Sequence, residues 1–202
     1  MHKRSFLWAG AAILALGFLG TPNLALANGP VVVLPAPDTS GGRPLMACLK
    51  DRKTDRRLTG EDLPLPDLSS LLWAAWGVNR PDGRHVVPTA RNEQKVMLFV
   101  VLSDGVWQYQ PENNSIKKVL DGDQRKRFDN ASLILLYAAP AGELFSGMHV
   151  GSMYQNVGLY CASEGLPNCV KYTRHDALAG ELKLPKGWKV LITQSVGSAR
   201  NR

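Results

Sequence analysis

Apolar residues recur along this chain at two spacings, one typical of helices and the other of strands. The segment 64–76 carries an apolar stripe at i, i+3, i+4 and i+7, formed by Leu68, Leu71, Leu72 and Ala75. Pro66 suits the first turn of such a helix, and Gly77 suits the position just past its end. We therefore predict a helix over 64–76. Weaker patterns predict further helices over 44–51, 148–164 and 176–182.

The strand signal is strongest at 131–139, a continuous apolar run that predicts a central strand buried on both faces. Shorter apolar or alternating runs predict strands at 96–102, 106–110, 170–173 and 188–195. Asp104-Gly105 is a hairpin turn signal between two of them. Helices and strands do not alternate regularly, so the pattern indicates an α+β fold with one sheet of four to five strands packed by helices.

The amino terminus has the three parts of a secretory signal peptide. A basic start with Lys3 and Arg4 precedes an apolar run over 6–20, and Ala25 and Ala27 supply the small residues of a cleavage site. The alternative is an uncleaved N-terminal anchor, although fifteen apolar residues are short for a membrane span. We predict a signal peptide over 1–27 and a periplasmic or secreted mature protein.

Cleavage of the signal peptide would change the length and the net charge of the mature protein. Removing 27 of 202 residues leaves 175, and the loss of Lys3 and Arg4 lowers the net charge from +7 to +5. This length fits one domain, at 44–202, after a Pro- and Gly-rich extended lead-in at 28–43. No later stretch is apolar and long enough to span a membrane. The charge is too small to indicate nucleic-acid binding but is compatible with an anionic ligand.

The three cysteines allow at most one internal disulfide, which an oxidising compartment would permit. Cys161 and Cys169 are near enough in sequence to form it. The alternative is that these two and Cys48 are small buried apolar residues. No spacing of cysteine and histidine resembles a metal site.

A cationic cluster follows the first predicted helix of the mature chain. Arg52, Lys53, Thr54 and Arg56 place three cations and a hydroxyl within five residues. Such groups form short charge-assisted hydrogen bonds to a phosphate. The alternative is an ordinary solvated surface run. No glycine-rich phosphate loop is present elsewhere.

A polar loop directly before the predicted strand at 96–102 is the second candidate for a ligand-binding segment. The loop runs Val87-Pro88-Thr89-Ala90-Arg91-Asn92. Asn92 offers a donor and an acceptor, which suits the edge of a ring that alternates donors and acceptors. The alternative is an ordinary turn.

The order and spacing of these pieces resemble the FMN-dependent nitroreductase superfamily. The resemblance is carried by 52–56, 63–80, 87–92, 104–109, 151–159, 165–166 and 196–197, and it covers about residues 44–200. Within the superfamily the chain looks most similar to the thiazole- and oxazole-forming (azoline) dehydrogenases. The resemblance implies an α+β fold with a mostly antiparallel sheet, and a homodimer with FMN at the subunit interface.

The resemblance also assigns site residues. The family's phosphate-binding segment matches Arg52, Lys53, Thr54 and Arg56, and its flavin-contacting loop matches Pro88, Thr89, Ala90 and Asn92. Family members often close the phosphate site with basic residues near the C-terminus, where this chain has Arg200 and Arg202.

The chemistry that this implies belongs to the flavin. FMN would accept electrons from a donor and pass them to a small-molecule substrate in a ping-pong cycle, while the protein binds and orients it. This explains why no side-chain nucleophile or general base is visible. The alternative function is a shortened nitroreductase-like binding or interaction module without redox activity.

Overall fold

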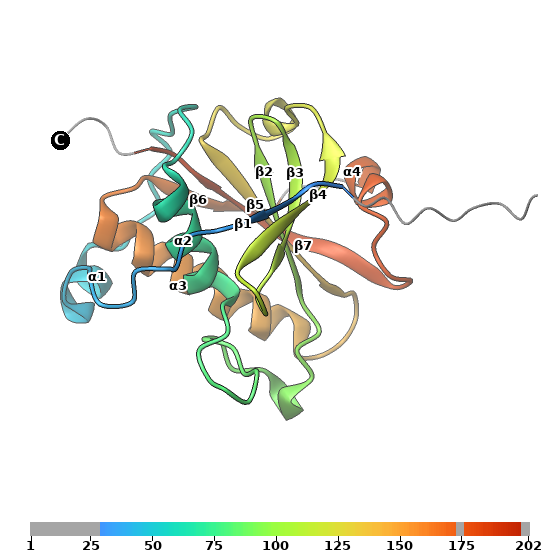
Figure 1. Cartoon of the computed structure of the whole chain (residues 1–202), viewed down its shortest axis with the longest axis horizontal. Coiled ribbons are helices and arrows are strands. Elements are labelled where there is room, and N and C mark those ends of the chain that lie inside the picture. The colour runs from blue at the N-terminus through green and yellow to red at the C-terminus, as the bar shows by residue number, and fades with distance from the viewer. Residues whose placement is uncertain (1–28, 173–175, 199–202) are drawn as a thin grey trace, which may run out of the picture.

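The computed structural model describes residues 29–172 and 176–198 (Figure 1). Those residues form one antiparallel sheet in the order β1-β4-β3-β2-β5-β7-β6. Its strands are β1 (Val31–Val33), β2 (Met97–Leu102), β3 (Gly105–Gln110), β4 (Ser115–Asp121), β5 (Leu133–Pro140), β6 (Asn168–Lys171) and β7 (Trp188–Val196). The helices are α1 (Leu45–Asp51), α2 (Leu65–Trp76), α3 (Ser146–Glu164) and α4 (Asp176–Glu181). The predicted α+β class is confirmed. The predicted signal peptide, Arg200 and Arg202 lie outside the described residues.

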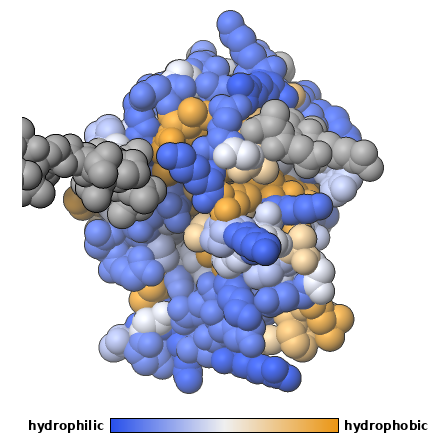
Figure 2. All heavy atoms as spheres, turned by 90° about the vertical axis from the view of Figure 1, so that its right-hand side faces the viewer, coloured by the Kyte–Doolittle hydropathy of each residue, from blue (hydrophilic) through white to orange (hydrophobic). Residues whose placement is uncertain are grey.

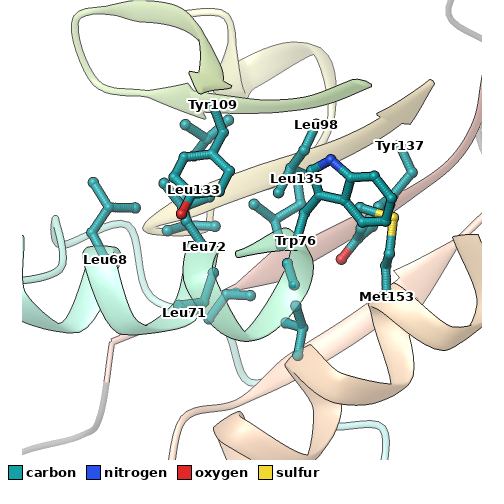
Figure 3. Close-up of a cluster of buried hydrophobic side chains, with 14 of the residues drawn as sticks. Leu68, Leu71, Leu72, Trp76, Leu98, Tyr109, Leu133, Leu135, Tyr137 and Met153 are labelled. Atoms are coloured by element: carbon teal, nitrogen blue, oxygen red, sulfur yellow. The ribbon is translucent and has the colours of Figure 1, made fainter. Parts of the chain in front are cut away.

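Helices α2 and α3 cover one face of the sheet. Trp76 of α2 and Met153 of α3 meet Leu98, Leu135 and Tyr137 of the central strands (Figure 3). These side chains are at most 3% exposed. A buried cluster of this size is the main source of hydrophobic stabilisation for a domain of this length. The apolar stripe of the segment 64–76 thus points into the core, as predicted.

The opposite face of the sheet carries a second apolar cluster. It is formed by alternate residues of the same strands, among them Phe99, Val101, Ile134 and Leu136, and is covered by Leu178 and Leu182 at α4. All eight residues of β5 are buried, because helices or loops cover both of its faces. The prediction of a central strand over 131–139 is therefore confirmed. Around α4 the molecular surface is mostly hydrophilic, and apolar atoms appear only in separate patches (Figure 2).

The sheet has seven strands, so the prediction of four to five was too low. Strand β4 contains Lys117 and Lys118 and lacks a continuous apolar signal, yet it pairs with β3 through a long register. Strand β1 lies in the segment predicted as a lead-in, where it pairs with β4 at the sheet edge. The adjacent Leu34 is only 5% exposed and belongs to the core. Both strands are fixed by pairing partners that local patterns do not reveal.

The ends of the two long helices follow from local chemistry. Gly77 is the C-cap of α2, and Gly165 ends α3 with φ at 70°, a left-handed conformation that glycine adopts without steric cost. Helix α3 begins at Ser146, two residues before the predicted start. Cys48, Cys161 and Cys169 are all free and buried, so no disulfide joins Cys161 to Cys169. Burial raises the pKa of the Cys161 thiol well above its usual range.

Candidate functional site

The cationic cluster lies where α1 ends and the chain turns past α3. Arg52 is the C-cap of α1. A Cβ atom placed on Gly158 of α3 would lie 3.6 Å from both Cγ and Cδ of Arg52. The stem of Arg52 therefore runs along the helix at a glycine that leaves room for it. The other cluster residues, Lys53, Thr54 and Arg56, are exposed.

A cleft of about 640 Å³ opens beside this cluster. One wall comes from the cationic segment and includes Lys53, Asp55 and Arg57; the other comes from the C-terminal half of α3 and the turn at 165–168. Ligand pockets in proteins commonly measure 300–1,000 Å³, so the cleft is large enough for a cofactor-sized molecule. Lys50, Arg57 and Asn168 line it but were not among the predicted site residues.

The carboxylates near the cleft are already paired. Arg57 donates to Asp55 through Nε at 2.9 Å and Nη2 at 2.5 Å, and it holds the pKa of Asp55 well below its usual range. Arg43 likewise donates to Asp51 and lowers the pKa of that carboxyl group. These two acids are therefore ionised at neutral pH and their charge is compensated.

The three cations of the cluster form no direct pairs within the described residues, although the charge of Lys53 helps to lower the pKa of Asp51 and of Asp55. Among the described residues, no ion pair or side-chain hydrogen bond engages Arg52, Lys53 or Arg56. Of the predicted cluster only Lys53 lines the cleft, while Arg52, Thr54 and Arg56 belong to the same segment but are not among the lining residues. The donor set of this segment fits a phosphate, which prefers several short charge-assisted hydrogen bonds.

Asn168 also lines the cleft and is only 7% exposed. Its backbone carbonyl accepts from the Asp55 amide at 2.8 Å, and its Oδ1 accepts from Gln194 Nε2 at 3.0 Å. Gln194 in turn accepts from the hydroxyl of Tyr137 at 2.7 Å. Because Oδ1 is turned toward Gln194, the Nδ2 group points away from it, and no acceptor for Nδ2 occurs in the part of the chain that the structure describes. A buried amide group in a residue that lines a cleft is a candidate ligand contact.

The second predicted segment forms a tight turn before β2. Val87 anchors it in the core, and residues Ala90–Asn92 make one 3₁₀ turn. Arg91 and Asn92 have φ of 55° and 53°, in the left-handed region. The Ala90 amide donates to Nε2 of His149, in the first turn of α3, at 2.8 Å. Asn92 is exposed, and its Oδ1 accepts from Gln94 Nε2 at 3.1 Å.

The structure does not bring the two predicted segments together within one chain. They contact α3 at Gly158 and at His149, nine residues apart. That spacing is roughly 13 Å along a helix and half a turn around it. The two segments therefore flank the solvent-facing side of α3, which carries Met148, Gly151 and Gln155.

The C-terminal end of the described chain lies beside the segment that follows the cationic cluster. A Cβ on Gly197 would be 2.8 Å from the Thr59 amide nitrogen, and the hydroxyl groups of Ser198 and Thr59 are 2.5 Å apart. Arg200 and Arg202 follow from this point. Their role in the site stays a prediction.

Comparison with known proteins identifies the family. The nitroreductase family model matches residues 49–198, and the chain belongs to that family. A provisionally named nitroreductase of Ralstonia eutropha is 32% identical, and its crystal structure superposes with a TM-score of 0.79 over 87% of this chain and 92% of that one.

Two further relatives agree with this assignment. A protein of Methanocaldococcus jannaschii, also provisionally named a nitroreductase, is 29% identical over 57% of this chain and 71% of its own length. A Bacteroides fragilis nitroreductase solved with bound FMN shares the fold, with 14% identity, a TM-score of 0.54 and coverage of 78% and 89%. The predicted superfamily is confirmed, and the chain is similar to oxidoreductases. The azoline-dehydrogenase branch stays a prediction.

Two other kinds of feature are absent from the described residues. No helix there has the length and apolar character that a membrane crossing requires. No group of three or more histidine, cysteine, aspartate or glutamate side chains is placed to hold a metal ion within those residues.

Proposed function

We propose that this protein is an FMN-dependent oxidoreductase that passes electrons through bound FMN to a small organic acceptor. The observation that carries the proposal is a cleft of about 640 Å³ lined by Lys50, Lys53 and Arg57, in a segment where Arg52 and Arg56 have no ion-pair partner among the described residues. Membership of the nitroreductase family supports the reaction class. The fold shared with an FMN-bound nitroreductase supports the cofactor.

The cationic segment would hold the phosphate. Arg52 and Arg56 offer planar guanidinium groups, Lys53 offers a point charge, and Thr54 offers a hydroxyl donor. Asp55 is paired to Arg57 and forms no salt bridge with these cations, although it also attracts Lys53 electrostatically. Arg200 and Arg202 would add charge from the C-terminal end. Bound FMN would supply the electron-transfer chemistry, and the residues of the chain bind and orient it.

The turn at 88–92 would contact the flavin ring. Pro88 and Thr89 begin the turn, the Ala90 amide is already bonded to His149, and the Asn92 side-chain amide is exposed. The ring edge alternates donors and acceptors, which an amide can match. Asn168, which lines the cleft beside the cationic segment, is a further candidate contact.

A homodimer explains how one FMN could use both segments. They flank the exposed side of α3 in each chain, so a two-fold packing of α3 against α3 would place the cationic segment of one chain near the 88–92 turn of its partner. Exposed apolar residues near this surface support such packing: Leu45 and Met46 of α1 are 62% and 75% exposed, and Met148 of α3 is 60% exposed. Sedimentation of the mature chain should give twice the monomer mass.

Export and the azoline-dehydrogenase branch also belong to the proposal. The signal-peptide pattern over 1–27 supports export. Expression with the leader intact should deliver a chain that begins near residue 28 to the periplasm or medium, and N-terminal sequencing of that material tests the point.

The decisive experiment is the visible spectrum of residues 28–202 after purification. We expect flavin absorbance bands, or their appearance on adding FMN, and reoxidation of the chemically reduced protein by a quinone or nitroaromatic acceptor. If the protein has no flavin and binds none on reconstitution, the proposed function is wrong. That outcome would favour the alternative of a binding or interaction module without redox activity.

A further inference from the structure

The 88–92 turn holds a backbone conformation that its residues do not favour. Arg91, Asn92 and Gln94 all have φ between 52° and 55°, and none is glycine. The left-handed region costs most non-glycine residues about 1–2 kcal/mol, although asparagine tolerates it better. Such conformations persist only where surrounding contacts fix them. The contacts of this turn are therefore part of what defines its shape.

One of those contacts reaches out of the turn to helix α3. Within the turn, the Asn92 amide bonds to Thr89 and the Glu93 amide bonds to Ala90. The Ala90 amide instead donates to Nε2 of His149, 59 positions away, at 2.8 Å. This bond ties the strained turn to the helix that the cationic segment also contacts.

His149 is well placed to act as a fixed acceptor. The residue is 7% exposed, and its ring stacks on Phe145 one turn earlier, with 6.3 Å between ring centroids and 20° between planes. A backbone amide can only donate, so Nε2 must be unprotonated and the ring proton must sit on Nδ1. The stacked, buried ring has little freedom to turn away. The position of the Ala90 amide is thus set by helix α3.

We infer that His149 is a positioning residue for the ring-contacting turn of the flavin site. The inference rests on the proposed function. His149 acts through Ala90. It accepts the hydrogen bond of the Ala90 backbone amide, and this contact fixes the turn so that Thr89 and Asn92 are oriented for the ligand. Because the phosphate-binding segment contacts α3 at Gly158, on the opposite side of the helix, His149 affects recognition of the ring and not of the phosphate.

Two flavins and two variants test this. Riboflavin carries the same ring as FMN but no phosphate. His149→Leu removes the acceptor, while His149→Gln keeps an amide oxygen that can accept from Ala90. We expect His149→Leu to weaken FMN and riboflavin by the same factor, about tenfold for one lost hydrogen bond, and His149→Gln to recover most of the loss. Arg52→Ala is the matched contrast and should weaken FMN alone.

Hydrogen exchange gives a readout that needs no flavin. The Ala90 amide should exchange faster in His149→Leu than in the parent and should regain protection in His149→Gln. The inference is wrong if His149→Leu binds both flavins as the parent does, if it loses FMN selectively, or if His149→Gln is as impaired as His149→Leu. If the parent binds neither flavin, the proposed function fails instead, and Ala90 exchange still shows whether His149 fixes the turn.

Discussion

The cationic segment at 52–57 and the turn at 88–92 lie against the same helix, but they prepare a ligand site by different physical means. In the cationic segment the specific property is charge. Arg52, Lys53 and Arg56 are exposed and lack an ion-pair partner among the described residues, while Arg57 neutralises Asp55. Ligand binding by this segment would therefore depend on the charges of its side chains more than on the conformation of its backbone.

In the 88–92 turn the specific property is backbone shape. Arg91 and Asn92 are held in the left-handed region, and the Ala90 amide is bonded to a buried imidazole. A phosphate can be recognised by free charge on an exposed segment, whereas a flat ring needs donors and acceptors at fixed positions. Variants that change charge and variants that change backbone should therefore act differently in the two regions.

The largest effect is expected from removing charge in the cationic segment. Arg52→Ala or Arg56→Ala should weaken FMN binding by about 1–3 kcal/mol, the usual loss for a charge-assisted hydrogen bond, and leave riboflavin binding unchanged. Fluorescence titration of both flavins measures this. Arg84→Ala is the control, because Arg84 is a half-exposed arginine that pairs with Asp82 in another loop. FMN affinities of Arg52→Ala and Arg56→Ala equal to that of Arg84→Ala would show that the phosphate lies elsewhere.

A second prediction concerns backbone strain and uses stability as its readout. Arg91→Ile places a β-branched residue at φ of 55° and should lower the free energy of unfolding by about 1–2 kcal/mol. The same change at Arg56, in the exposed cationic segment, should stay within about 0.5 kcal/mol of the parent. Urea denaturation of the two variants compares them directly. Equal stability of both would mean that the turn relaxes freely and that its shape is not fixed by the fold.

The same contrast explains which features are predictable from sequence. The cationic segment is visible because charge is a property of residue type, and α2 and β5 are visible because burial imposes a local period on apolar residues. The family resemblance rests on the order of such local signals. These features alone are enough to predict the fold class, three of the helices almost to the residue, and the central strand.

The remainder depends on contacts between distant residues. Strand β4 has two lysines in its middle and is defined by pairing with β3 and β1. The bond from Ala90 to His149 spans 59 positions, and nothing in either local sequence indicates it. Asn168 lines the cleft with its Oδ1 bonded to Gln194 on the neighbouring strand, and local sequence does not indicate that contact. Residues that carry charge are thus predictable from sequence, whereas residues that hold geometry through distant partners are not.

The smallest effect is expected from the ion pair inside the cationic segment. Arg57 lowers the pKa of Asp55 below its unfolded value of about 4, so the pair stabilises the fold fully above that pH. The Arg57 side chain is 67% exposed, so solvent screens the pair and the gain should be small. Urea denaturation of Asp55→Asn should thus show a small deficit at pH 7 that is unchanged at pH 5 and shrinks in more acidic buffer, as the pH falls through the lower folded-state pKa and Asp55 of the parent takes up a proton. Asp121→Asn, whose native carboxylate is 94% exposed, serves as the control and should match the parent. A deficit that grows on acidification would contradict the pairing, and with it the reason why Asp55 leaves the neighbouring cations free.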